Sequence, residues 1–372
     1  MKHAQKAALV ILTLCLVIIA GACSKKQVAT TGVKIGALLP LTGDNASYGV
    51  DCRKGMELAL EEYNAANKQK AVIFFEDTKA DPKTAVTAIN RLITMNKPKI
   101  IVGDMFSNTT LAVAPIAQQN GIVLITPTAA LETIPATGDH IFTIYPTSKY
   151  EGQFVASYAL KKGLKRFGVI KQQVQVAEEI GDAFADKVNS EQGEVVFNEV
   201  VPSDVKDFRN ILSKFINKNV DAVFVSAYRD EAGNIIKQAR ELGYNKLFLS
   251  QSTLYDDKVL QLFGKSVEGV IFSAPYFNDL AESNTIKVFQ AQFQKKYQTK
   301  PNIWAAYGYD VVNLALKAAD QSEKSQKPLT QTLSDFKFDG VTGPMSFFPN
   351  RTVDKTMEMF TIKNNSFQKT GN

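Results

Sequence analysis

The chain has 372 residues, of which 45% are hydrophobic and 22% are charged, and its formal net charge is +6. This length exceeds the roughly 250–300 residues that one hydrophobic core normally supports, so two lobes are expected. The composition is globular throughout, and the mild positive charge is not gathered into a basic cluster with interleaved aromatic residues. Nucleic acid is therefore excluded as a partner.

The N-terminus has the pattern of an export signal. A positive region with Lys2 and Lys6 precedes an apolar run over 7–20, and small residues then lead to Cys23. The run is shorter than the about 20 apolar residues that a membrane-spanning helix needs, which favours a signal peptide. Its end, Ala-Gly-Ala-Cys, resembles a bacterial lipobox, in which the cysteine is acylated. We expect a lipoprotein signal peptide over 1–22 and a lipid anchor on Cys23; the alternative is ordinary cleavage with the cysteine incidental.

The polar segment 23–32 suits a flexible tether between the membrane and a folded domain. No later segment reaches the length of a membrane span, so the lipid is the expected membrane contact. The protein is predicted to be exported and held at the periplasm or the cell surface. Loss of Lys2 and Lys6 with the leader lowers the formal net charge from +6 to +4.

Apolar runs then alternate with segments of helical periodicity. In the first series, strands are expected at 33–39, 72–75, 100–103, 122–125 and 141–144, and helices at 50–66, 82–95, 109–119 and 150–162. In the second, strands are expected at 167–170, 195–200, 222–226 and 247–250, and helices at 178–192, 207–218 and 230–242. Near-continuous β-branched runs between helices indicate parallel strands that are covered on both faces. Two such series predict two doubly wound α/β lobes, with ligands bound beyond the carboxyl ends of the strands.

The chain lacks the side chains that an enzyme would need. His140 is the one histidine outside the leader and is expected in a loop. The adjacent acids Asp256 and Asp257 are interpreted as N-capping charges rather than a metal pair. Cys52 is the one remaining thiol, so it supplies neither an internal disulfide nor a zinc site and is expected to be buried. We predict a binding protein without enzymatic activity, cofactor or metal.

Six stretches carry a resemblance to a known family. They are KIGALLPLTGDNASYGVDCRKGMELALEE at 34–62, EDTKADPKTAVTA at 76–88, GDMFS at 103–107, ITPTAA at 125–130, VSAY at 225–228 and FDGVTGP at 338–344. In their order and spacing they resemble the type I periplasmic binding proteins of the leucine/isoleucine/valine class. The resemblance covers roughly residues 33–365.

This resemblance implies two lobes joined by three crossovers, with a solute that closes the hinge and an ABC permease in the membrane that recognises the closed form. One lobe would comprise 33–147 with 279–345, and the other 148–278 with 346–372. The crossovers would lie near 146–147, 277–278 and 346–347. The expected ligand is an amino acid, of the branched-chain type by family, or a related small carboxylate.

Ser107 and the segment 128–130 are expected to bind a ligand carboxylate. Ser107 follows a strand and precedes a helix, so its hydroxyl and nearby backbone N–H groups can meet an anion, which the helix N-terminus also favours. The alternative use of Ser107 is a plain N-cap. Thr128, Ala129 and Ala130 would add hydroxyl and backbone contacts. Tyr48, in the first loop, would form a wall for the ligand side chain.

The second lobe departs from the family at the ligand's ammonium end. Tyr228, at the end of a strand, would close over the ligand. The family's acidic residue after the strand 247–250 is replaced, with Ser252 as the equivalent, and Ala130 stands where a threonine assists. A buried ammonium without a carboxylate is costly. Either Asp230 or Glu231 serves instead, or the ligand is a carboxylate, amide or aromatic acid without an α-ammonium.

Two roles remain open for such a protein. It is the solute receptor of an ABC importer, or a sensor that passes the same closure to a membrane signalling partner. Neighbouring permease and ATPase genes would favour the importer. A hydrolase on an α/β scaffold would need a nucleophile and base, which the sequence does not offer.

Overall fold

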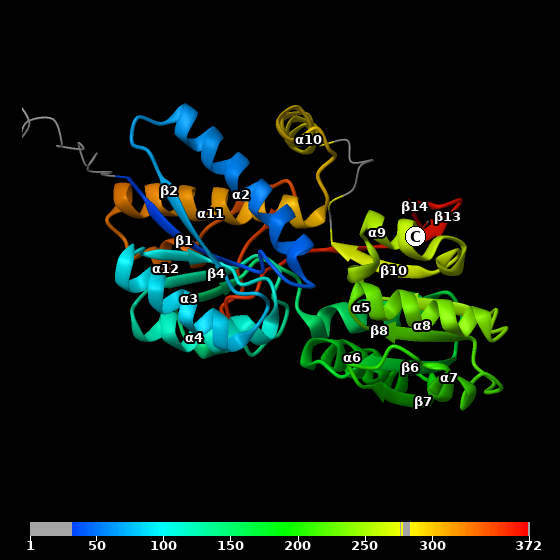
Figure 1. The fold of residues 1–372 in the computed structure, drawn as a ribbon. Helices are drawn as coiled ribbons and strands as arrows, with labels where there is room; N and C mark the ends of the chain where they lie inside the picture. Colours follow the sequence, from blue (N-terminus) through cyan, green and yellow to red (C-terminus); the bar gives the residue numbers. More distant parts are fainter. Residues whose placement is uncertain (1–31, 276, 278–282, 371–372) are drawn as a thin grey trace, which may run out of the picture.

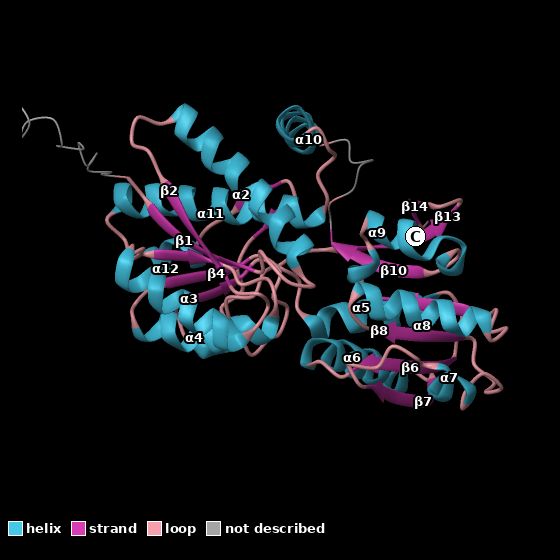
Figure 2. Ribbon diagram, viewed as in Figure 1, coloured by secondary structure: helices cyan, strands magenta, loops and turns pink. Residues whose placement is uncertain are grey.

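The computed structural model describes residues 32–275, 277 and 283–370. The leader 1–22, Cys23 and nearly all of the tether lie outside the described residues, so export signal and lipid anchor stay predictions. Two sheets, each with helices on both faces, form two lobes side by side (Figure 1; helices and strands are distinguished in Figure 2). This confirms the predicted α/β class. None of the helices in the described ranges is long and apolar enough to cross a membrane.

The first lobe is built on a five-stranded parallel sheet in the order β2-β1-β3-β4-β5. Its strands are β1 (Lys34–Leu39), β2 (Val72–Asp77), β3 (Ile100–Val102), β4 (Val123–Thr126) and β5 (Ile141–Thr143). Alternate side chains of β1 point to opposite faces, so Ile35 and Ala37 join one core and Leu38 joins the other. The first of these cores is covered by α2 (Ala46–Ala66), α10 (Asn284–Tyr297), α11 (Ile303–Ser325) and α12 (Leu329–Ser334), and the second by α3 (Pro82–Met95) and α4 (Ser107–Gln119).

The second lobe holds a seven-stranded sheet in the order β14-β13-β10-β9-β8-β6-β7. Its parallel strands are β6 (Arg166–Gln172), β7 (Glu194–Val201), β8 (Ala222–Ser226), β9 (Leu247–Ser250) and β10 (Ile271–Pro275). The C-terminal strands β13 (Met357–Lys363) and β14 (Ser366–Lys369) are added antiparallel. One face is covered by α5 (Ser148–Lys161) and α6 (Gln175–Ser190), and the other by α7 (Arg209–Ser213), α8 (Arg229–Glu241) and α9 (Asp257–Phe263).

The chain passes between the two sheets three times. It does so from β5 to α5, from β10 to α10, and from the small hairpin β11 (Phe338–Gly340) and β12 (Gly343–Met345) to β13. Three short 3₁₀ turns are η1 (Pro135–Thr137), η2 (Ser252–Leu254) and η3 (Gly264–Val267). The lobes are therefore connected by three segments that are distant in the sequence.

Most predicted elements are present, and α3, β8 and β9 have the predicted limits. The helix predicted over 50–66 begins earlier, because Ala46 N–H donates to Gly43 O (3.1 Å) and Tyr48 N–H to Asn45 O (3.2 Å). The placement of Tyr48 in a loop is therefore wrong: it lies in the first turn of α2. Cys52, in the same helix, is fully buried, as predicted.

The helix predicted over 207–218 is the largest error among these elements. It is reduced to α7, after which Phe215 N–H donates to Leu212 O and Lys218 N–H to Phe215 O, each three residues back. The ring of Phe215 stacks on Phe197 of β7, with centroids 4.2 Å apart. The helix ends early, and turns bring Phe215 into the core.

Candidate functional site

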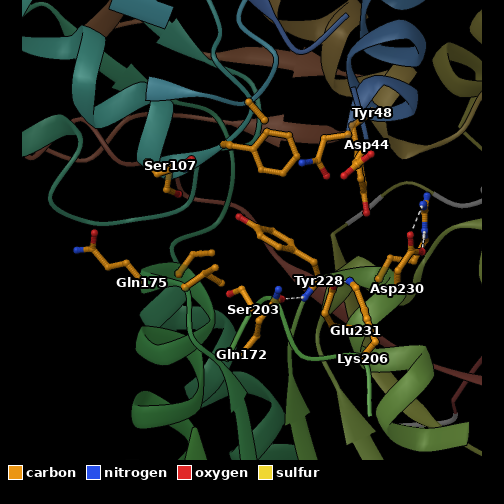
Figure 3. A pocket seen from close by; sticks show the side chains of 17 residues that line it. Asp44, Tyr48, Ser107, Gln172, Gln175, Ser203, Lys206, Tyr228, Asp230 and Glu231 are labelled. Carbon is orange, nitrogen blue, oxygen red and sulfur yellow. Dashed lines mark hydrogen bonds and ion pairs between the residues drawn. The ribbon is translucent and has the colours of Figure 1, made fainter. Parts of the chain in front are cut away.

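Two adjoining cavities lie between the lobes, beyond the carboxyl ends of the strands. The outer cavity has a volume of about 740 Å³ and the inner one about 60 Å³. The residues that line both are Tyr48, Phe106, Ser107, Val176 and Tyr228. In Figure 3, Tyr48 and Ser107 extend from the first lobe, and Tyr228 faces them from the second. A molecule in the inner cavity would contact both lobes.

Aromatic rings form much of the inner cavity wall. Tyr48 lies edge-on to Trp304 and to Phe106, with centroids 5.1 and 5.7 Å apart. Phe106 in turn meets Tyr228 of the second lobe edge-to-face at 5.5 Å. The Nε1 of Trp304 is buried and has no hydrogen-bond partner among the described residues. The cavity therefore offers an apolar wall with one unused donor.

The loops after β3 and β4 meet at the polar end of this cavity. Ser107 is the first residue of α4, Phe106 is its N-cap, and no side chain caps the helix. The Oγ of Ser107 accepts a hydrogen bond from Ala130 N–H (3.2 Å), and Thr128 Oγ1 donates to Met105 O (2.9 Å). In the described part of the chain, the hydroxyl hydrogen of Ser107 has no acceptor. The helix start thus keeps unsatisfied N–H groups beside a free O–H donor.

Six of the seven expected ligand-binding residues line the inner cavity. They are Tyr48, Ser107, Thr128, Ala130, Tyr228 and Ser252. Ala129 lines neither cavity: it is fully buried, and its N–H donates to Thr126 Oγ1 (3.1 Å). The apolar side chain of Val176 lines both cavities on the side of the second lobe.

The carboxylate of the inner cavity belongs to Glu151, which the sequence reasoning missed. Glu151 lies in the first turn of α5, whose N-cap is Thr147, and it is only 1% exposed. Its Oε1 accepts from Ser252 N–H (2.7 Å) and from Ser273 Oγ (2.6 Å). Burial raises the pKa of Glu151, while the hydrogen bonds from Ser273 and Ser252 oppose the rise. From sequence, an acid in a first helical turn is indistinguishable from an ordinary dipole-stabilising charge.

The two acids proposed from sequence for an ammonium line the outer cavity only. Asp230 forms an ion pair with Arg229 (2.8 Å), and Glu231 with Lys206 (3.1 Å). Each of these carboxylates already has a cationic partner. They do not reach the inner cavity.

Arg229 is a second link between the lobes. Its guanidinium pairs with the buried Asp256 (2.9 Å) and lies 5.1 Å from the ring centroid of Tyr48, in cation–π contact. Asp256 also caps α9 by accepting from Lys258 N–H (2.9 Å), which confirms that it is an N-capping acid. No group of residues suited to a metal ion occurs in the described ranges.

Comparison with known proteins identifies the family. Residues 32–368 match the sequence profile described as periplasmic binding protein. The Leu/Ile/Val-binding protein of Escherichia coli K12 is 25% identical over 322 residues, which are 85% of this chain and 86% of that protein.

Solved structures show the same fold. The branched-chain amino acid transporter substrate-binding protein of Streptococcus pneumoniae, in complex with isoleucine, has a TM-score of 0.82 and 27% identity, covering 91% of this chain and 98% of its own. A solute-binding protein of an ABC transporter from R. palustris, in complex with benzoate, also has a TM-score of 0.82, with 21% identity over 91% of this chain and 96% of its own. Together with the two-lobed architecture, the profile match over nearly the whole described chain shows that this protein belongs to the periplasmic binding protein family.

Proposed function

We propose that the protein is the substrate-binding component of an ABC importer and captures an amino acid or a related small carboxylate between its lobes. The observation that carries the proposal is the inner cavity, whose aromatic wall is shared by both lobes through Phe106 and Tyr228. The named ligands of the compared proteins, isoleucine and benzoate, are both small carboxylates with an apolar part. Such a molecule combines the two features that this cavity offers, an apolar wall and a polar end.

The carboxylate would bind at the start of α4. The hydroxyl of Ser107 can donate to it, and the first-turn N–H groups and the helix dipole favour an anion there. Thr128 and Ala130 would line this end and support Ser107, since the Thr128 hydroxyl donates to Met105 O and the Ala130 N–H to Ser107 Oγ. The apolar part of the ligand would lie against Tyr48 and Trp304.

Capture would work through closure about the three connecting segments. The proposed lobe limits are 33–147 with 279–345 for one lobe and 148–278 with 346–372 for the other. The closed form would be recognised by an ABC permease, while acylated Cys23 would hold the exported protein at the membrane. A sensor would use the same closure, so ligand uptake by vesicles that contain the cognate permease distinguishes the two roles.

A ligand screen tests the proposal. Leucine, isoleucine, valine, threonine and benzoate should include ligands that raise the melting temperature, because a ligand that binds only the folded form adds about 2.7 kcal/mol at 100 times its Kd. The same ligands should lower the radius of gyration in small-angle scattering, since both lobes contact the inner cavity. Glucose is the control. A melting temperature that responds to glucose and to none of the carboxylates would contradict the proposal.

A further inference from the structure

We propose that Glu151 provides the countercharge for a cationic amino group of the ligand, so that the protein selects α-amino acids over carboxylic acids that lack the amino group. This inference rests on the proposed function and specifies the ligand class for the same cavity. The family's acid is replaced by Ser252, and Asp230 and Glu231, the substitutes expected from the sequence, line only the outer cavity. The structure places a different acid directly behind Ser252, since the N–H of Ser252 donates to Glu151 Oε1.

Glu151 differs from every other residue that lines the inner cavity in having a side chain that can carry a charge at neutral pH. Of the described residues that line it, Glu151 alone is an acid or a base of the Asp, Glu, Lys, Arg or His type. The other polar side-chain groups are hydroxyls, the amide of Gln251 and the indole N–H of Trp304, none of which carries a charge. A charged ligand group at this end of the cavity would therefore meet the one carboxyl group there, which a cation would stabilise in its negative form.

The hydrogen bonds around Glu151 favour its ionised form but do not neutralise it. Both donors to Oε1, the Ser252 N–H and the Ser273 hydroxyl, are uncharged. No Lys, Arg or His of the described ranges forms an ion pair with Glu151, and it is 1% exposed. A buried carboxylate without a cationic partner is unfavourable, and a ligand ammonium supplies that partner.

The shared lining of the cavity would bring both ligand charges within reach of the protein. Ser107 from the first lobe and Glu151 from the second line the same space of about 60 Å³. An α-amino acid carries its carboxylate and ammonium on one carbon, so a single small molecule can meet both groups. A plain carboxylate would instead place a second negative charge in the same cavity as Glu151, which like-charge repulsion disfavours.

Matched ligand pairs on the wild-type protein give the first test. Calorimetry would compare leucine, valine and phenylalanine with 4-methylpentanoate, 3-methylbutanoate and 3-phenylpropanoate, which differ only by the missing amino group. We expect at least one amino acid to bind ten times or more tightly than its deamino partner. If the deamino acids bind as tightly or more tightly, the proposed function stands and the role of Glu151 is overturned. If no carboxylate of either kind binds, the proposed function itself fails.

The variant Glu151→Gln gives the second test, because glutamine keeps the volume and one acceptor oxygen for Ser252 and Ser273. Its amino-acid affinity should fall tenfold or more, while its affinity for the deamino partner stays the same or rises. Glu179→Gln is the matched control: it removes a half-buried carboxylate from α6 that lines neither cavity, and it should change neither affinity. Circular dichroism would check the fold of both variants. If Glu151→Gln folds and binds amino acids as tightly as the wild type does, the inference is overturned. If Glu151→Gln does not fold, the comparison of ligand pairs on the wild-type protein decides the inference.

Discussion

Single hydroxyls line the proposed carboxylate end of the site. Ser107 Oγ accepts from Ala130 N–H and thereby joins the loops after β3 and β4, while its own hydrogen remains available. The same side chain therefore shapes the site and can contact the ligand. Thr128 differs, because its hydroxyl hydrogen is already donated to Met105 O.

Replacing Ser107 by alanine tests whether its hydroxyl contacts the ligand. Ser107→Ala should weaken a carboxylate ligand by about 1–2 kcal/mol, the scale of one charge-assisted hydrogen bond, as measured by calorimetry. Ser334→Ala, an exposed change at the end of α12, is the control and should leave the affinity unchanged. An affinity for Ser107→Ala equal to that of the wild type would remove Ser107 from the site.

At the scale of elements, close packing of α2 on α11 positions the aromatic wall. Each helix carries a glycine at the contact: a Cβ added at Gly55 would lie 1.9 Å from Ala305 O, and one at Gly308 would lie 2.0 Å from Cys52 O. Only glycine allows backbones to approach this closely. The first helix presents Tyr48 and the second Trp304, so the packing distance sets the position of both rings.

A methyl group at this contact should therefore affect both stability and binding. Gly308→Ala is expected to lower the free energy of unfolding by about 1–3 kcal/mol, the usual effect of overpacking a core, in a urea titration. Ligand affinity should fall as well, because Tyr48 and Trp304 are displaced. Ser325→Ala, at the exposed end of α11, should change neither quantity. Unaltered stability in Gly308→Ala would show that the two helices can separate without penalty.

At the scale of the whole molecule, binding and membrane attachment belong to different parts of the chain. The described lobes contain both cavities, whereas the proposed anchor, Cys23, precedes them. Cys23→Ala should release the exported protein from the membrane fraction and abolish labelling by a radioactive fatty acid. Its ligand affinity should equal that of the wild type. Retention of the unlabelled variant in membranes would contradict the lipid anchor.

The alternation of strands and helices could be predicted from the sequence, and so could the meeting of Ser107 and Thr128 at one cavity. Buried parallel strands are near-continuous apolar runs, so they are visible locally, as for β8 and β9. Ser107 and Thr128 could be predicted to converge because the carboxyl ends of neighbouring parallel strands share one edge of a sheet. Local pattern was insufficient for α7, which ends at Ser213, just before Phe215 stacks on Phe197 of β7.

The acid that lines the inner cavity could be identified only from the fold. Asp230 and Glu231 adjoin Tyr228 in the sequence, yet Arg229 and Lys206 hold them in the outer cavity. Glu151 lies 101 residues from Ser252 and contacts it because α5 packs beside β10, where Ser273 also donates to Glu151. The burial and the charge pairing of a side chain depend on contacts between residues that are distant in the sequence, and a local sequence pattern does not reveal such contacts. The sequence therefore predicted that Ser107 and Thr128 meet at one cavity, because both follow neighbouring parallel strands, and the fold placed beside it the buried carboxylate that we propose selects an amino acid.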